Sequence, residues 1–221
     1  PMLYAEWPKK VVGAKTLLYY MHFDGQPVVP AEWTQPDPWK PVVKKRISGK
    51  WETIPADALF ADKLDSDLRV FARASSDDKG PILMFLAAFD GLKQLGLEPA
   101  TNVKVLLDSE EEKGSPGIHA VASANKTLLE TDAIIIHDGP RHQSERPTII
   151  FGNRGATQIT LVVHGPKQPL HSGHFGNYVP NPAIRLARLI ASMKDDQGRV
   201  TIAGYYDRIK LSEAERKILA D

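Results

Sequence analysis

The 221-residue chain contains no cysteine, which excludes disulfide bonds, thiolate zinc sites and cysteine nucleophiles. It also lacks an excess of either charge, because 28 Lys and Arg residues stand against 27 Asp and Glu residues. This balance gives no reason to expect a nucleic-acid partner or an anionic membrane surface as a partner. No apolar run approaches the roughly 18 residues that a membrane-spanning helix needs. The composition, 42% hydrophobic and 25% charged, is that of a globular protein with one or two domains.

The two ends are not those expected of a complete gene product. The chain begins at Pro1 with neither an initiator Met nor an export signal. It stops at Asp221, shortly after a helical pattern begins at Ser212. We therefore expect a fragment or a trimmed form of a longer protein.

The first third of the chain mixes apolar runs with a proline-rich stretch. Residues 17–22 (LLYYMH) form a short apolar and aromatic run that predicts a buried strand. Residues 25–60 are rich in Pro and Trp, and we expect an irregular surface excursion there, because proline at this density disrupts regular strand pairing.

An alternation of strands and helices follows. Strand-like residues 68–72, 103–107 and 133–136 are separated by helices predicted at 80–95 and 116–130. The strands are apolar throughout rather than alternating, which is typical of a parallel sheet covered by helices. The sequence therefore predicts an α/β fold with three layers and a mostly parallel sheet.

The pattern changes after Pro147. The predicted elements there are strands at 148–151, 158–163 and 200–203, and a helix at 182–193. We expect residues 1–154 to be part of the α/β domain and residues 155–221 to be part of a smaller α+β domain.

Side chains suited to chemistry gather at the carboxyl ends of the predicted strands, where open α/β sheets place their sites. The clusters are His22 with Asp24, Asp77 with Asp78, Glu110 to Glu112, and Asp138. Each alone has an ordinary explanation as a loop start, a helix cap, a solvated face or a turn. Together they are more informative, because converging carboxylates repel one another and divalent cations remove that penalty. One imidazole with several carboxylate oxygens suits zinc, and also manganese or cobalt, so a two-metal hydrolytic site uses every cluster.

Six segments make this interpretation specific. They are HFDGQPV (22–28), DPWKP (37–41), SSDDKGP (75–81), EEEKGSPG (110–117), the stretch ending in Arg154 and Gly155, and LHSGHFGN (170–177). Their order and spacing resemble the dinuclear zinc exopeptidase family, which includes carnosinase-type dipeptidases, glutamate carboxypeptidases, aminoacylases and acetylornithine deacetylase. The resemblance runs from about Thr16 to Asp207 and is strongest to the dipeptidase branch. It implies a catalytic domain with part of a lid domain used for dimerisation.

The resemblance implies metal ligands at four positions. His22 and Glu112 would bind the first zinc ion, Asp138 would bind the second, and Asp77 would bridge both. Asp78 would point away, because adjacent side chains diverge. The family's last ligand, a His near its C-terminus, has no counterpart in the chain.

Three further side chains receive catalytic roles from the resemblance. Asp24 would orient the imidazole of His22 by accepting its other N–H group. Glu111 would be the general base that activates water. His171 would reach into the site of a partner subunit and help to bind the carbonyl oxygen as negative charge develops. From the residues alone, His171 is better interpreted as a loop-capping residue beside Gly173.

We therefore expect a homodimeric metallopeptidase that hydrolyses dipeptides or short peptides with a free C-terminal carboxylate. One alternative is an N-acyl amino acid amidohydrolase with the same machinery, and another is an inactive truncated scaffold or dimerisation module. Because the last ligand is absent, we expect the chain alone to bind metal weakly and to be inactive.

Two departures from the family pattern affect the rim of the expected site. The usual Gly-Arg-Gly before the Asp pair is Ala72-Arg73-Ala74 here, so the turn must be one that alanine can adopt. The stretch between Pro41 and Arg73 is longer than the family's usual hairpin. Substrate preference is therefore not expected to transfer directly from relatives.

Overall fold

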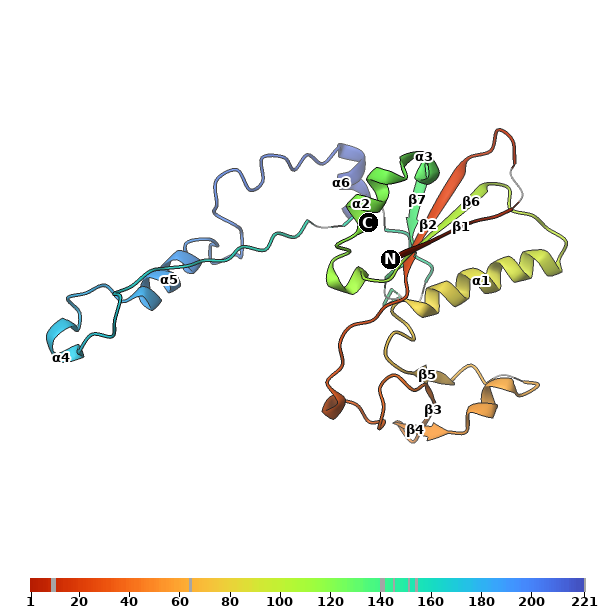
Figure 1. Ribbon diagram of the computed structural model, residues 1–221, viewed down its shortest axis with the longest axis horizontal. Helices are drawn as coiled ribbons and strands as arrows, with labels where there is room; N and C mark the ends of the chain where they lie inside the picture. The colour runs from red at the N-terminus through yellow and green to blue at the C-terminus, as the bar shows by residue number, and fades with distance from the viewer. Residues whose placement is uncertain are drawn as a thin grey trace. The chain divides into compact units, whose positions relative to one another are not determined.

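The computed structural model describes residues 1–8, 11–63, 65–139, 142–144, 146–150, 152–153 and 155–220 (Figure 1). The chain divides into two compact units, Pro1–Ile149 and Ile150–Asp221. Each unit is described by itself below.

A four-stranded sheet forms the centre of the first unit. In spatial order its strands are β1 (Met2–Glu6), β6 (Asn102–Asp108), β2 (Thr16–His22) and β7 (Ala133–Ile136). β6, β2 and β7 run parallel, whereas β1 pairs with β6 in the antiparallel direction at one edge. The buried core lies on the central strands and includes Leu18, Met21, Val103 and Leu106. The predicted strands at 17–22, 103–107 and 133–136 are thus confirmed, and β1 is an addition.

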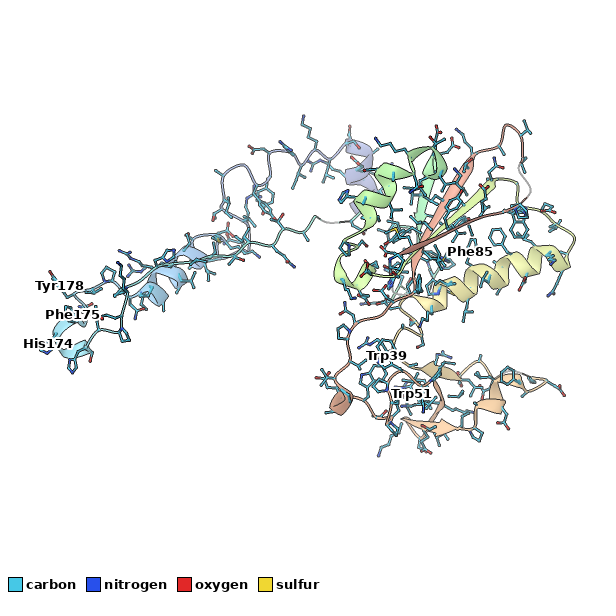
Figure 2. The ribbon with its side chains drawn as sticks, viewed as in Figure 1. Trp39, Trp51, Phe85, His174, Phe175 and Tyr178 are labelled. Carbon is cyan, nitrogen blue, oxygen red and sulfur yellow. The ribbon has the colours of Figure 1, made fainter. Side chains whose placement is uncertain are left out.

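Helices cover both faces of this sheet, so the predicted three-layer α/β class is confirmed (Figure 1). On one face, Phe85 of α1 (Lys79–Gln94) packs against Tyr19, with ring centroids 4.9 Å apart (Figure 2). Lys104 points to the other face, because its neighbour Val105 pairs with Tyr19 and side chains alternate along a strand. Its Nζ donates 2.7 Å hydrogen bonds to the carbonyl oxygens of Leu128 and Glu130, at the end of the second helical layer.

That second layer is less regular than the single helix predicted for 116–130. It consists of α2 (Ile118–Ala124) and α3 (Lys126–Leu129), which are separated at Asn125. The predicted start, with Ser115 as the cap and Pro116 as the first helical residue, is wrong by two residues, because Gly117 precedes the helix and Ser115 lies in a turn with a φ of 48°.

A separate three-stranded antiparallel sheet corrects the expectation for residues 25–60. Its strands, in the order β4, β3, β5, are β4 (Lys50–Ile54), β3 (Val42–Ile47) and β5 (Arg69–Phe71). The prolines lie outside the hairpin, and the run 42–54 contains none. Ser48 and Gly49 form the two-residue turn with φ values of 49° and 83°, the combination that fits a tight hairpin.

The strand predicted at 68–72 therefore exists, but it does not belong to the parallel sheet. β5 pairs only with β3 within the described residues, and Trp51 of β4 packs against Phe71 of β5 with ring centroids 5.2 Å apart (Figure 2). Short 3₁₀ turns lie around this region and in the loop after β6: Pro30–Glu32, Ala56–Phe60 and Glu111–Lys113.

The second unit contains helices but little strand pairing among its described residues. The helices are α4 (Ser172–Phe175), α5 (Pro182–Ala191) and α6 (Glu213–Ala220). The helix predicted at 182–193 is confirmed, and Asn181 Oδ1 caps it by accepting the N–H of Ala183 at 2.8 Å. The strands predicted at 158–163 and over the described part of 148–151 do not form, and 200–203 contributes one bridge, between Lys194 and Val200. Extended segments need a neighbouring strand for their hydrogen bonds, and among the described residues of this unit the Lys194–Val200 bridge is the one such pairing.

None of the helices in the described ranges combines the length and the apolar character needed to cross a membrane.

Candidate metal centre

Three side chains from distant parts of the sequence offer metal-binding atoms within 4.8 Å of one another: His22, Asp77 and Asp138. His22 Nε2 lies 2.9 Å from Asp77 Oδ1 and 3.7 Å from Asp138 Oδ2. The imidazole is 1% exposed, whereas the Asp77 and Asp138 side chains are 65% and 30% exposed. The group is therefore anchored in the core on one side and open to solvent on the other.

The parallel sheet explains how two of these residues meet. His22 is the last residue of β2, and Asp138 follows β7, its parallel neighbour, so both lie at the same edge. Asp77 belongs to a different element from the one that the sequence predicts. It lies in the turn before α1 rather than at the end of a strand of this sheet, because β5 belongs to the other sheet.

Asp24 lies behind the imidazole, as its expected role requires. Its Oδ1 is 3.2 Å from His22 Nδ1, and its Oδ2 accepts the backbone N–H of Glu112 at 3.2 Å. A carboxylate on Nδ1 favours the tautomer in which that nitrogen carries the proton, and this leaves Nε2 as the metal-binding atom. Asp24 therefore links the end of β2 to the acidic loop after β6.

Glu111 and Glu112 occupy different places in the 3₁₀ turn Glu111–Lys113. Glu111 Oε2 lies 3.9 Å from His22 Nε2. Burial raises the pKa of Glu111; His22 opposes this, and the charges of Asp138, Glu112 and Asp24 add to it. Glu112 is not a member of the three-residue group, and its Oε2 accepts a short 2.5 Å hydrogen bond from Gln26 Nε2.

Asp78 is fully buried beneath the centre. Its Oδ2 accepts the backbone N–H of His22 at 3.0 Å, while its Oδ1 has no hydrogen-bond partner. Burial raises its pKa to about 6, against the opposing effect of the His22 N–H. The alternative explanation of the Asp pair as a helix cap is wrong for Asp78, whose side chain caps no backbone group of α1.

The electrostatics of the site fit a divalent cation. Burial lowers the pKa of His22, but the nearby carboxylates of Asp138, Asp78, Glu111 and Asp77 outweigh this and raise it. An imidazole surrounded by this many acidic oxygens is the nitrogen and oxygen ligand set that zinc, manganese and cobalt accept. The residues of the centre therefore fit the metal that the sequence predicts.

Asp108 is a buried residue at this edge that sequence reasoning missed. It ends β6 and is 1% exposed, and its carboxylate accepts hydrogen bonds from Tyr20 Oη and the Glu110 N–H. The sequence carries a signal for it, because Asp108 ends an apolar run just before the three Glu residues 110–112.

His171 lies in the second unit, and its predicted contact with a partner subunit stays a prediction. Its Nδ1 accepts the N–H of Gly173 at 3.0 Å and caps α4. The rings of His171 and His174 lie 5.1 Å apart, on the loop that also carries Phe175 and Tyr178 (Figure 2). Of the six family-like segments, the one ending at Arg154 lies partly outside the described residues.

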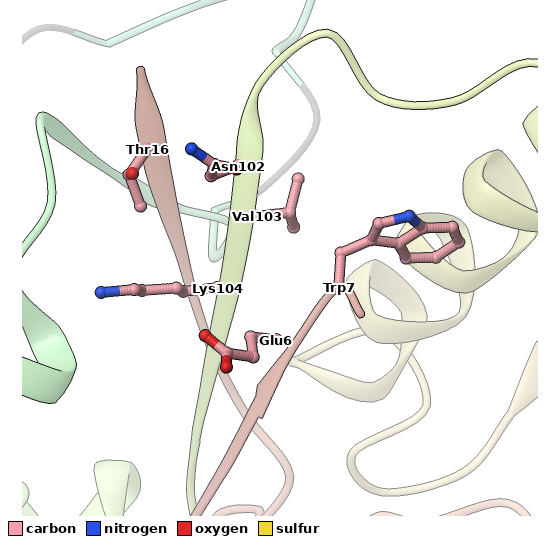
Figure 3. A pocket seen from close by; sticks show the side chains of 6 residues that line it. All are labelled: Glu6, Trp7, Thr16, Asn102, Val103 and Lys104. Carbon is pink, nitrogen blue, oxygen red and sulfur yellow. The ribbon is translucent and has the colours of Figure 1, made fainter. Parts of the chain in front are cut away.

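A small cavity of about 140 Å³ is unrelated to this centre (Figure 3). Its lining includes Thr16 and Asn102, the first residues of β2 and β6. It therefore lies at the amino ends of the parallel strands, whereas the candidate centre lies at their carboxyl ends.

Comparisons with known proteins point in the same direction as this geometry. The model of a family described as peptidase family M20/M25/M40 matches residues 18–212. A Cys-Gly metallodipeptidase from Schizosaccharomyces pombe is 29% identical over 197 residues, covering 88% of this chain and 37% of the relative. A cysteinylglycine-S-conjugate dipeptidase from Corynebacterium striatum is 32% identical over 198 residues, covering 89% and 38%.

A solved structure extends the similarity to the fold. An M20 family metallo-carboxypeptidase from Sulfolobus solfataricus is 32% identical, with a TM-score of 0.65, covering 100% of this chain and 45% of that chain. The chain thus spans less than half the length of these similar proteins.

Proposed function

The chain belongs to peptidase family M20/M25/M40, and from that premise we propose that it carries the metal centre of a dipeptidase. The observation that supports this most directly is the meeting of His22, Asp77 and Asp138 within 4.8 Å, with a Glu111 carboxylate oxygen 3.9 Å from the imidazole. The relatives with dipeptidase names support a substrate of two residues.

The proposed centre would hold two zinc ions. His22, Asp77 and Asp138 would contribute ligand atoms, and Glu112 would join them by exchanging its hydrogen bond with Gln26 for a metal. When bound, the metals supply Lewis-acid stabilisation and lower the pKa of water. Asp24 keeps the His22 ring in position throughout, because it holds Nδ1.

Glu111 is the proposed general base. It takes a proton from a water molecule whose oxygen attacks the carbonyl carbon of the peptide bond. When the C–N bond breaks, Glu111 returns that proton to the leaving nitrogen, so the first products are a carboxylic acid and an amine. The acid then passes the second proton of the water molecule to the amine, which leaves a carboxylate and an ammonium group. The raised pKa of Glu111 suits this exchange, because a base that both accepts and returns a proton works best near the operating pH.

The test is a Glu111→Gln substitution in the zinc-loaded full-length protein, assayed on Cys-Gly. We expect the rate to fall by about 10²–10⁴-fold, the usual contribution of a general base, with zinc still bound. Glu130→Gln is the matched control, because Glu130 is an exposed Glu of the same unit and should leave the rate unchanged. An unchanged rate in Glu111→Gln would rule out the assigned base.

The substrate class is tested with a panel of dipeptides and N-acetyl amino acids. Hydrolysis of the dipeptides alone supports the proposal, whereas preference for the acylated compounds would make the protein an N-acyl amino acid amidohydrolase. A zinc-loaded protein that hydrolyses neither would support a non-catalytic scaffold.

We also propose that His171 helps to bind the substrate carbonyl oxygen in the site of a second copy of the protein. Its side chain is exposed, and because Nδ1 accepts a hydrogen bond, the neutral ring carries its proton on Nε2 and can donate from there. Mixing an inactive His171→Ala variant with an inactive Glu111→Gln variant should restore partial activity, since some mixed dimers contain one intact site. If the two variants are dissociated, mixed and re-associated and no activity returns, the proposed role of His171 is contradicted.

A further inference from the structure

Asp108 is a buried charged residue that the proposed mechanism does not use. It is the last residue of β6 and pairs in register with His22, the last residue of β2. Its carboxylate is 1% exposed, so it must be stabilised by hydrogen bonds rather than by water.

Those hydrogen bonds connect Asp108 to Glu110, where the acidic loop of residues 110–115 begins. Asp108 Oδ1 accepts the backbone N–H of Glu110 at 2.9 Å, and Asp108 Oδ2 accepts the hydroxyl of Tyr20 at 3.0 Å. Burial by itself would raise the pKa of Asp108, but the hydrogen bonds from Glu110, Ser115 and Tyr20 outweigh it and lower the pKa. The carboxylate therefore stays ionised, and hydrogen bonds to an ionised group are the stronger kind.

The same network reaches the end of the loop. Tyr20 Oη lies 3.4 Å from Ser115 Oγ, and burial raises the pKa of Tyr20 to about 12, so its hydroxyl keeps its proton. The Ser115 N–H in turn donates to the Glu110 carbonyl oxygen at 3.0 Å and closes the loop. Asp108 and Tyr20 thus hold both ends of residues 110–115, and Glu111 and Glu112 lie between these ends.

We infer that Asp108, acting through Tyr20 and Ser115, is a positioning residue that holds the loop 110–115 in the shape that places Glu111 beside His22. The structural part of this inference stands on the contacts above, and its kinetic consequence rests on the proposed function of Glu111 as the base.

Hydrogen exchange tests the structural part without any assay of activity. In Asp108→Asn the side-chain amide has one oxygen that accepts a hydrogen bond, where the carboxylate has two. We therefore expect the backbone N–H groups of residues 110–115 to exchange at least about tenfold faster. Asp132→Asn is the matched control, because Asp132 also accepts a backbone N–H, that of Thr16 at 2.8 Å, at the opposite end of β2. Unchanged exchange of the loop in Asp108→Asn would overturn the inference.

Steady-state kinetics test the consequence for the proposed site. Small displacements of a catalytic group cost up to about 10²-fold in rate, so we expect kcat at saturating zinc to fall by about 10–100-fold in Asp108→Asn, with KM unchanged. Tyr20→Phe, which keeps the ring volume, should show a smaller fall in kcat and serves if Asp108→Asn does not fold. A rise in KM with unchanged kcat would contradict a positioning role.

The two proposals fail in different ways. If Glu111→Gln is fully active but the loop still loosens in Asp108→Asn, the assignment of the base is wrong and the positioning of the loop stands. If Glu111→Gln is inactive but the loop does not loosen, the base stands and the role of Asp108 falls.

Discussion

Gly25 and Ala74 approach so closely that a Cβ atom on Gly25 would lie 2.9 Å from the Cβ of Ala74. Ala74 is 4% exposed and has a φ of 61°, in the left-handed region that favours glycine. It is the last residue of the Ala72-Arg73-Ala74 turn, where the family pattern leads one to expect Gly. This turn precedes Asp77, while Gly25 follows Asp24, so the contact joins the two loops that carry the centre.

Ala74→Gly is expected to stabilise the protein. An L-residue in the left-handed region costs roughly 1–2 kcal/mol, and the chain entropy of a new glycine offsets about 0.5–1 kcal/mol of that. The free energy of unfolding should therefore rise by the difference between these two amounts, about 0.5–1 kcal/mol. Urea denaturation measures this rise. A decrease would show that the Ala74 methyl group contributes more by packing than its backbone costs.

Gly25→Ala is expected to destabilise the protein by about 1–3 kcal/mol, the usual cost of an added methyl group in a packed site. The same substitution should cost much less when combined with Ala74→Gly, because the opposing methyl group is then gone. Urea denaturation of both single variants and the double variant gives the coupling energy. Additive effects would contradict the close contact.

The zinc affinity of the proposed centre is expected to depend on Asp77 and Asp138. Asp77→Asn or Asp138→Asn should each weaken zinc binding by at least about 100-fold, since even the loss of residues behind the ligands costs 10–100-fold. Titration calorimetry at constant pH measures this. Asp37→Asn, a loop carboxylate that accepts the N–H of Trp39, should leave the affinity unchanged.

The zinc affinity is also expected to fall on acidification. Zinc needs the neutral imidazole of His22, and neighbouring carboxylates raise the pKa of that ring above its ordinary value, so protons compete with zinc at a higher pH than they would at an isolated imidazole. Below the raised pKa, the apparent affinity should fall by about tenfold per pH unit. Because the Asp78 charge contributes to this shift, Asp78→Asn should move the onset to lower pH, and an unmoved onset would contradict that cause.

Much of the central sheet and the centre could be predicted from the sequence. The strands at 17–22, 103–107 and 133–136 are apolar runs bounded by polar residues, so length and composition alone identify them. Because parallel strands end at one edge, placing His22 and Asp138 together followed directly. Asp77 was placed at the same edge as well, but for a wrong reason, because the strand at 68–72 before it belongs to the small sheet and Asp77 lies in the turn before α1.

Other features depend on contacts between distant residues that no local pattern reveals. The hairpin at 42–54 is one such feature, because prolines lie close on either side of it and give the whole stretch 25–60 the composition of an irregular segment. The hydrogen bond between Gln26 and Glu112 joins residues 86 positions apart, and an uncharged Gln gives no signal of its own. In the second unit, the expected strands have high β-propensity, but propensity without a pairing partner forms no sheet.

The hairpin of β3 and β4 provides a last prediction about the fold. Gly49 has a φ of 83°, with no atom within 4 Å of an added Cβ, so Gly49→Ala introduces backbone strain without a steric clash. We expect a loss of about 1 kcal/mol from the left-handed backbone and faster hydrogen exchange at 42–54. Gly96→Ala is the matched control, since Gly96 has a φ of 66° and equal space around it but lies just beyond α1. Gly96→Ala should lower the free energy of unfolding by a similar amount, but the faster hydrogen exchange should appear at the end of α1. Equal acceleration at 42–54 in both variants would mean that the turn does not govern the small sheet.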